Sequence, residues 1–551
     1  MRRVRTVIAA AAVSLVVPCA NAVAIPLHPR TVERLTDYGR LHEWVWIAEN
    51  STAEGIRVQP SEDPVLSLER PAAGLRVLAL LVEFEDVPGV ERRGPREVAR
   101  LLFGEADRLA KSVAGFFSTS SGGALTVSGE VFGWVPVPGL LGEYASEQAG
   151  LGRYPTNAQK LVEDALAAAG DLPLKEFDEF GRGSGGDGVV DVLLVVHSGR
   201  GAEITGEPGD LWSHTGMLPS PIKKDGMRVE SYILAAAESG RGLLCHEIAL
   251  LLGAPPLYDP TYRGTGLDAW SLMGTGAWSG NARPGTAGLD AYSRVHLGFA
   301  TPVDVREDRA GVVLGCGRQP PTVFRLFPQG RPGPEYFLVE CRSRFRFDRF
   351  LPGEGVLIYH VDERSADGRF PGCGPGLLHP RVAVEQADGR CELEAGLRAE
   401  ANDLWARLDV DRFPPSAFDD SSTPNSNDYK DHRTGVAVRN LRLLDGDLVA
   451  DFFVTAEPDS SGVLRLTANV EKEKGRSVVI IRVRGVRRGP VELRVRNPEG
   501  RVVWSRDLSF KFPGNQQVRW DPSAAADAAS GVYFVEAETA DGWDVRRVSV
   551  P

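Results

Sequence analysis

Apolar runs and amphipathic stretches alternate over the first half of the chain. Leu75–Phe84 and Val189–His197 are almost entirely apolar, which is typical of strands covered on both faces. Around them the pattern predicts helices at 31–38, 96–103, 106–117 and 156–169, a strand at 125–131 and an apolar helix at 243–252. This succession predicts mixed α and β layers, so we expect an α+β domain at 76–300.

From residue 301 onward, strand-sized segments separated by Gly and Pro replace the helical pattern. We expect a β-rich domain at 301–455, a polar linker, and a last domain at 463–551. The strands predicted in the last domain are 478–483, 491–495, 502–508, 517–520, 531–537 and 544–550. Within it, Trp520-Asp521-Pro522 followed by Ser530–Val535 resembles the Ig-like C-terminal module of many exported bacterial proteins, and this implies a small β-sandwich.

The N-terminus has the pattern of a secretory signal. Arg2, Arg3 and Arg5 precede an apolar run up to Cys19, and Ala20-Asn21-Ala22 fits a small-x-small cleavage site. We expect a signal peptide at 1–22 and a secreted or cell-surface protein, with a lipid anchor on Cys19 as the alternative. No later apolar stretch is long enough to span a bilayer. Residues 23–75 are expected to form an N-terminal arm or a pro-region.

The charge and the cysteines narrow the choice of partners and of compartment. Loss of the signal removes three Arg and no acid, so the formal net charge changes from −11 to −14. Such an acidic chain is a poor partner for nucleic acid or anionic membrane, and an extracellular protein or peptide is expected instead. Export is oxidising, so Cys316 with Cys341 and Cys373 with Cys391 are plausible disulfide pairs, although the sequence does not fix the connectivity. Cys245 is then a buried free thiol.

The apolar helix contains a metal-site spacing that is only partly filled. Two His four residues apart lie on one helical face and can share a zinc ion, with the Glu between them as general base. A Gly then turns the chain back to deliver a third ligand. In this chain the first His, the Glu and the Gly are His246, Glu247 and Gly253. The second His position is Leu250 and the third-ligand position is Pro256, and neither side chain binds metal.

The sequence around this helix carries a family resemblance. Pro255-Pro256-Leu257-Tyr258-Asp259, then Gly264–Trp278 with Met273, then Leu289–Phe299 resemble the immune inhibitor A-like secreted metallopeptidases. The likeness extends from about residue 26 to 455. It implies a metzincin-like protease domain, a zinc cofactor held through His246, Glu247 as general base, and Met273 in a turn beneath the metal.

A Gly-rich loop upstream resembles a second metal site. The family has a loop like D-x-D-x-D-G-x-x-D here, a spacing that holds calcium through converging oxygens. Asp187 and Asp191 are retained, but Gly183 and Gly185 stand at the first two acidic positions. Asp178 could substitute only by looping back. A Gly-rich turn with solvated acids is the alternative to calcium binding.

The free energy of zinc binding argues against a bound zinc ion at this site. Structural zinc binds with roughly 10–16 kcal/mol over four ligands, so losing two ligands costs something like 6 kcal/mol, on the order of 10⁴-fold. Rescue would need other ligands, and the candidates are His214, His296, Asp259 and Asp268. The sequence therefore predicts a non-catalytic peptidase homologue, a pseudoenzyme without bound metal that acts in binding or at the cell surface.

Two further functions stay open. The first is an active zinc endopeptidase hydrolysing extracellular proteins, with Glu247 as general base. The second is a purely structural envelope protein. A serine hydrolase is poorly supported, because Ser271 and Ser279 occupy turn positions and no nucleophile elbow is present.

Overall fold

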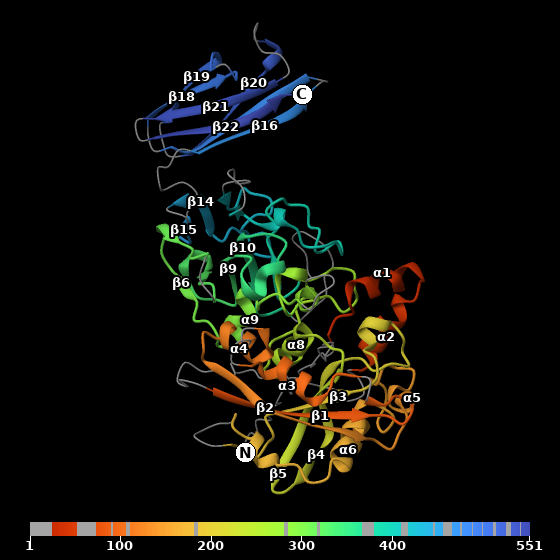
Figure 1. The fold of residues 1–551 in the computed structure, drawn as a ribbon. Helices are drawn as coiled ribbons and strands as arrows, with labels where there is room; N and C mark the ends of the chain where they lie inside the picture. The colour runs from red at the N-terminus through yellow and green to blue at the C-terminus, as the bar shows by residue number, and fades with distance from the viewer. Residues whose placement is uncertain are drawn as a thin grey trace, which may run out of the picture.

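A computed structural model shows three parts stacked one above another, an α/β part, a β-rich part and a C-terminal pair of sheets (Figure 1). The structure describes the following residues: 25–51, 73–89, 92–105, 111–180, 186–279, 285–316, 320–365, 379–408, 417–444, 447–455, 465–473, 476–486, 489–498, 500–510, 514–524, 531–539 and 542–550.

The α/β part is built on a mixed sheet in the order β2-β1-β3-β5-β4. Its strands are β1 (Ala73–Glu83), β2 (Leu125–Pro136), β3 (Val192–His197), β4 (His214–Lys224) and β5 (Met227–Ala236). All neighbours are parallel except β4, which runs antiparallel to β5 at the edge. The two long apolar runs are therefore interior strands, as predicted, whereas the β4–β5 hairpin was not predicted.

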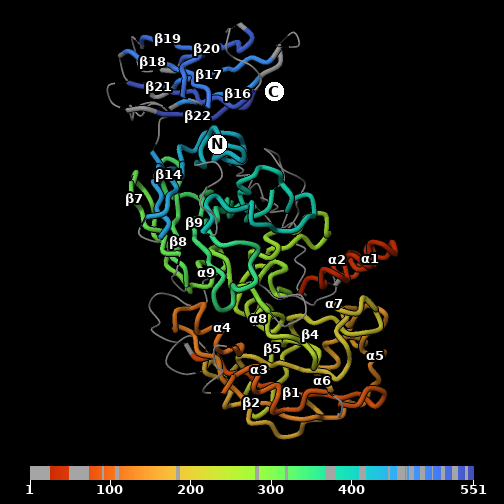
Figure 2. The backbone as a smooth tube through the Cα atoms, turned by 45° about the horizontal axis from the view of Figure 1, so that its top comes forward, coloured from red at the N-terminus to blue at the C-terminus, as the bar shows by residue number. Residues whose placement is uncertain are grey.

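Helices cover both faces of this sheet (Figure 2). Along β1, Val77 and Ala79 belong to one core and Leu78 and Leu80 to the other, since successive side chains point to opposite faces. The first core includes α3 (Pro95–Phe103), α4 (Val113–Ser120) and α8 (Arg241–Leu251), and the second includes α5 (Leu141–Ala145) and α6 (Ala158–Ala168). The predicted helix at 106–117 corresponds to α4, and its residues 106–110 lie outside the described residues.

The β-rich part follows α9 (Ala291–His296) and contains two sheets. The first has the order β11-β10-β9-β8-β6, with β12 paired to β10, and the second has the order β13-β14-β15-β7. Their bounds are β6 (Val303–Val305), β7 (Arg309–Val313), β8 (Val323–Leu326), β9 (Glu335–Arg342), β10 (Gly355–Asp362), β11 (Val382–Val384), β12 (Ala406–Arg407), β13 (Ala417–Phe418), β14 (Ala437–Leu444) and β15 (Asp447–Phe453). Leu338 and Tyr359 join the first core of the α/β part, so these two parts share a hydrophobic core.

The C-terminal part consists of two antiparallel sheets, β16-β17-β20 and β19-β18-β21-β22, around one core. The bounds are β16 (Arg465–Glu473), β17 (Arg476–Val486), β18 (Gly489–Arg496), β19 (Val502–Phe510), β20 (Gly514–Trp520), β21 (Gly531–Thr539) and β22 (Gly542–Val550). All six predicted strands are confirmed, and β16 is an additional one.

The N-terminal arm forms α1 (Pro29–Asp37), close to the predicted helix, and α2 (Leu41–Ser51). Thr31 Oγ1 donates to the carbonyl of Ile204, which lies in α7 (Ala202–Thr205), at 2.7 Å. Short 3₁₀ turns complete the chain: η3 (Leu174–Phe177), η4 (Asp268–Trp270), η5 (Thr275–Trp278), η6 (Pro328–Gly330), η7 (Arg346–Phe350), η8 (Ala401–Asp403) and η9 (Pro522–Ala524).

The cysteine predictions agree with the structure where it can be compared. Cys316 and Cys341 form a disulfide, and Cys245 is a buried free thiol. Cys391 is disulfide-bonded, and its expected partner Cys373 lies outside the described residues. Among the described helices, none has the length and apolar character needed to cross a bilayer.

Candidate functional site

Helix α8 brings His246 and Glu247 into the centre of the first core. Every residue from Gly242 to Leu250 is buried. A Cβ atom on Gly242 would lie 2.1 Å from the carbonyl oxygen of Ala277, so glycine permits the close approach of α8 to η5. At the other end Gly253, with φ +97°, turns the chain away from the helix. The local sequence thus fixes both ends of the helix.

His246 is held as a neutral imidazole with one nitrogen facing inward. Its Nδ1 lies 2.9 Å from the carbonyl oxygen of Leu272, which can only accept, so Nδ1 carries the proton. Burial lowers the pKa of His246 to about 4. The lone pair is therefore on Nε2, which has no hydrogen-bond partner among the described residues. This is the tautomer that a metal-ligating histidine would have.

The groups that would complete a zinc site do not fit. Leu250 lies one turn from His246 on the same face of α8 and is buried, and Pro256 has no donor atom to offer. Within the described residues, the acidic and sulfur or imidazole groups close enough to hold a metal are Asp388, Glu392 and Glu400, far along the chain from α8. One imidazole is a small fraction of the usual tetrahedral ligand set.

Glu247 is fully buried and hydrogen-bonded through both oxygens. Its Oε1 accepts from the backbone N–H of Ile25 at 3.1 Å, and its Oε2 accepts from Thr215 Oγ1 on β4 at 2.8 Å. Burial, with a smaller contribution from the nearby acid Glu203, raises the pKa of Glu247 to about 8. Both carboxylate oxygens are thus already engaged by the chain itself.

The N-terminal segment 25–28 crosses this site. Trp212 Nε1 donates to the carbonyl of Ile25 at 2.8 Å, and Trp278 Nε1 donates to the carbonyl of Pro26 at 2.9 Å. Leu27 N–H donates to the Tyr262 hydroxyl at 3.2 Å, and His28 N–H donates to the carbonyl of Glu203 at 2.9 Å. Ile25 and Leu27 are completely buried. Sequence reasoning missed this contact, which joins residues more than 180 positions apart.

The four alternative ligands are occupied elsewhere. His214 is bonded to Trp212 O at 2.7 Å and to the Tyr232 hydroxyl at 2.9 Å. His296 Nε2 lies 3.1 Å from Gly253 O. The carboxylate of Asp259 accepts from Thr261 and Gly264, and that of Asp268 accepts from Thr275 and Ala399. The structure therefore does not gather them around His246.

Met273 and the two turn serines have structural surroundings. Met273 is buried, its amide is bonded to Ser271 Oγ, and its carbonyl accepts from Leu257 N–H. The hydroxyl of Ser271 donates to Asp290, which also caps α9 through Ser293 N–H at 2.9 Å. Ser271 is thus tied into a turn, and Ser279 has no base within hydrogen-bond distance among the described residues.

The acids of the candidate calcium loop face backbone amides. Asp178 does loop back, since its carboxylate accepts from Asp187 N–H and Gly188 N–H at 2.8 and 2.9 Å. Asp191 accepts from Arg76 N–H and Phe180 N–H, and burial raises its pKa to about 6. Gly183 and Gly185 lie outside the described residues. Within the described part, Asp178, Asp187 and Asp191 do not form a cluster close enough to share a cation.

Comparison with known proteins identifies the α/β part. Residues 74–297 match the immune inhibitor A peptidase M6 catalytic domain. This segment is similar to the M6 peptidase catalytic domain, and we call it the M6 segment. The M6 segment begins in β1 and ends just after α9, so it contains the whole mixed sheet and α8.

Curated relatives agree over the same length. Immune inhibitor A of Bacillus thuringiensis subsp. alesti is 31% identical over 251 residues, which is 37% of this chain and 36% of that protein. The pre-pro-metalloprotease PrtV of Vibrio cholerae serotype O1 is 27% identical over 252 residues, which is 37% of this chain and 27% of that protein. The matches therefore span about a third of the relatives' length. A solved structure, wild type OgpA from Akkermansia muciniphila, aligns over 90% of this chain and 97% of that one at 8% identity and a TM-score of 0.15, too weak for any argument.

Proposed function

We propose that this chain is a secreted, non-catalytic homologue of the M6 peptidases that binds an extracellular protein or peptide. The observation that carries the proposal is the single imidazole of His246, with Leu250 and Pro256 where an M6 peptidase needs ligands. His246 Nε2 keeps the lone pair of a ligand, so the geometry of the ancestral site is retained while its donors are gone.

The contacts of Glu247 support the same proposal. A general base must be within reach of a water molecule or of substrate. Glu247 is fully buried and accepts instead from Ile25 and Thr215. The segment 25–28 also fills the approach to α8 with buried side chains. A substrate would have to displace at least the four backbone hydrogen bonds that this segment makes to tryptophan, tyrosine and glutamate residues.

The remaining parts fit an exported binding protein. We infer a metzincin-like arrangement for the M6 segment, since Leu272, next to Met273, contacts His246 from beneath α8. The two C-terminal sheets are inferred to be an Ig-like module, a type of domain that spaces or attaches proteins. Cleavage of the expected signal peptide at 1–22 would place the chain outside the cytoplasm.

The second candidate function is an active zinc endopeptidase. The unpartnered Nε2 of His246 favours it, because such a nitrogen could bind zinc if further ligands were recruited. Zinc would polarise a peptide carbonyl, and Glu247 would hold a proton during hydrolysis.

A proteolysis assay separates the two functions. The purified full-length chain and its Glu247→Gln variant are incubated with casein and gelatin, with and without a chelator. We expect no cleavage by either protein, because the ligand set of the site is incomplete. Cleavage by the parent that is lost on chelation and absent from the variant would establish the zinc endopeptidase instead.

A further inference from the structure

Two buried carboxylates lie against the start of the described chain. Glu247 and Glu203 are 0% and 1% exposed. Ile25 N–H donates to Glu247, and three residues later His28 N–H donates to the backbone carbonyl of Glu203. Ser213 donates to the Glu203 carboxylate through its N–H and its hydroxyl, at 3.1 and 2.9 Å. The segment 25–28 therefore contacts the carboxylate of Glu247 and the backbone of Glu203.

No cationic side chain compensates these acids within the described residues. The carboxylates of Glu247 and Glu203 accept hydrogen bonds from neutral N–H and O–H donors, and no ion pair among the described residues includes either of them. A buried carboxylate without a counter-charge costs several kcal/mol. A positive group at the position of the Ile25 nitrogen would contact Glu247 directly.

The sequence provides a way to create that positive group. Ala22-Val23-Ala24 has small residues at the two positions that signal peptidases read, as does Ala20-Asn21-Ala22 two residues earlier. The sequence pattern fits both sites, and the signal peptide expected at 1–22 corresponds to the earlier one. Only cleavage after Ala24 makes the nitrogen that touches Glu247 a chain terminus.

We propose that export cleaves the chain between Ala24 and Ile25, and that the new α-ammonium group of Ile25 forms a buried ion pair with Glu247. Cleavage consumes one water molecule and breaks the Ala24–Ile25 amide bond. The acyl carbon of Ala24 gains a carboxylate, and the nitrogen of Ile25 becomes an amine that takes up a proton near neutral pH. The co-reactants are water and a membrane signal endopeptidase.

The structure presents the Ile25 nitrogen rigidly. Pro26 restricts the backbone of the residue before it to an extended conformation. The indoles of Trp212 and Trp278 fix the carbonyls of Ile25 and Pro26, and the Ile25 side chain is completely buried. An ordered terminus at this position loses little additional entropy when it forms the ion pair. The chain's own first residue would then permanently occupy the site over α8.

The first test is the N-terminus of the exported protein, read by mass spectrometry of the intact chain and of its N-terminal peptide. The proposal predicts a chain that begins at Ile25. A chain that begins at Val23, or at any other residue, overturns it.

The second test is a thermodynamic cycle on the ion pair. Full-length chains that begin at Ile25 or at Val23 are each prepared with and without Glu247→Gln, and their melting temperatures are measured. We expect the two extra residues to lower the melting temperature by several degrees when Glu247 is present, and by much less when it is replaced. Equal shifts in the two backgrounds would overturn the ion pair.

The matched control is Glu33→Gln, since Glu33 is an acid of the same arm but its side chain is 69% exposed. In the Glu33→Gln background, we expect the two extra residues to lower the melting temperature by as much as they do in the parent. A reduction as large as that caused by Glu247→Gln would count against a specific pair. These measurements involve neither metal nor proteolysis, so the inference stands or falls separately from the proposed function.

Discussion

At the scale of single residues, the chemistry of the site depends on what faces His246 Nε2. The imidazole is oriented by Leu272 O as a ligand histidine would be, but the residue one helical turn away is Leu250. A single buried imidazole costs less than a buried ion, because burial keeps it neutral. The retained His246 is therefore compatible with a structural role.

Buried histidines of the site should make the fold sensitive to acid. Burial lowers the pKa of His214 to about 4 from 6.5 in the unfolded chain. Between pH 6.5 and 4 the unfolded chain binds a proton that the folded chain does not, so stability is lost as the pH falls through this window. In the parent, His214 should lower the free energy of unfolding by about 3 kcal/mol between pH 6.5 and pH 4. The His214→Gln variant should lack this contribution.

The measurement is urea unfolding of parent and variant at several pH values. The comparison is made between the two proteins, because Glu203 and Glu247 have raised pKa values and change stability in the opposite direction in both. Stability curves that run parallel from pH 6.5 to 4 would show that His214 is not held neutral by burial.

The sequence predicted single-residue features correctly where composition or nearby sequence determines them. The Cys316–Cys341 disulfide and the buried Cys245 thiol were predicted from compartment and pattern. The contact between Ile25 and Glu247 was not, because 222 residues separate them and no periodicity links the two positions. The partner of a buried acid is set by tertiary packing and leaves no local signal.

At the scale of elements, α8 has His246 and Glu247 on a buried helix with Leu250 one turn further along. Its apolar run predicted the helix, and Gly253 marks its end, as the sequence indicated. The β4–β5 hairpin, which supplies Thr215 to Glu247, was missed because the Pro and Lys residues of β4 interrupt any strand pattern. The helix could be predicted from the sequence, but the strand beside it could not.

Restoring the ligands should restore metal uptake. The double variant Leu250→His, Pro256→Asp returns two donors, which by the estimate of about 3 kcal/mol per ligand should strengthen zinc binding by on the order of 10⁴-fold. Isothermal titration with zinc is the measurement. The control is Leu251→His, which adds an imidazole to α8 next to the ligand face. A folded double variant that binds zinc no better than this control would mean that the pocket has closed.

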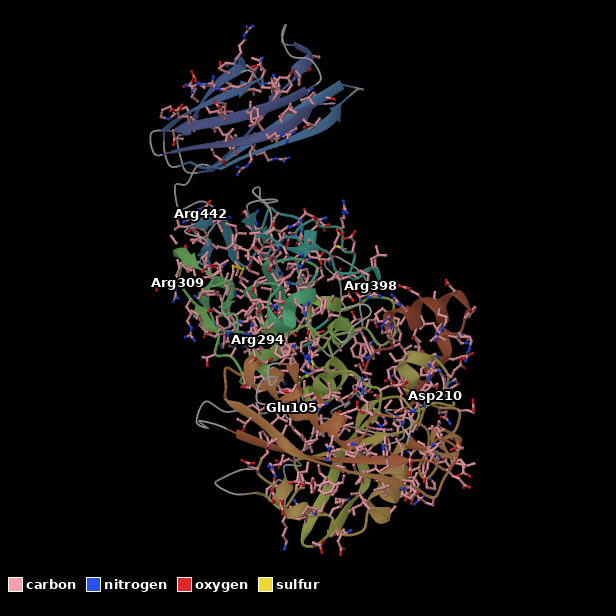
Figure 3. The ribbon with its side chains drawn as sticks, in the orientation of Figure 1. Glu105, Asp210, Arg294, Arg309, Arg398 and Arg442 are labelled. Atoms are coloured by element: carbon pink, nitrogen blue, oxygen red, sulfur yellow. A yellow bond between two sulfur atoms is a disulfide. The ribbon has the colours of Figure 1, made fainter. Side chains whose placement is uncertain are left out.

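At the scale of the whole molecule, buried ion pairs connect the α/β and β-rich parts. Arg294 of α9 contacts Glu340 of β9 at 2.6 Å, and Figure 3 shows Arg294 where the two parts meet. Arg342 contacts Glu340 and Asp348 at 3.2 and 2.6 Å and donates to Trp270 O. The shared core and these pairs make the two parts one packed unit.

Breaking this network should destabilise the chain strongly. Arg342→Ala leaves Glu340 and Asp348 buried without their cation, and we expect a loss of about 3–5 kcal/mol. Arg306→Ala is the control, since its side chain is 60% exposed and its pair with Asp304 should be worth about 0–1 kcal/mol. Denaturant unfolding of both variants measures the difference. Similar losses in the two would show that the buried network stabilises the chain no more than an exposed ion pair does.

The zinc content of the purified full-length chain tests the central claim most directly. The protein is prepared without chelator and without added metal, and the number of zinc ions per chain is measured by elemental mass spectrometry. With one imidazole and no second or third ligand at α8, we predict far less than one zinc per chain. One zinc per chain, lost when His246 is replaced by Ala, would contradict the account.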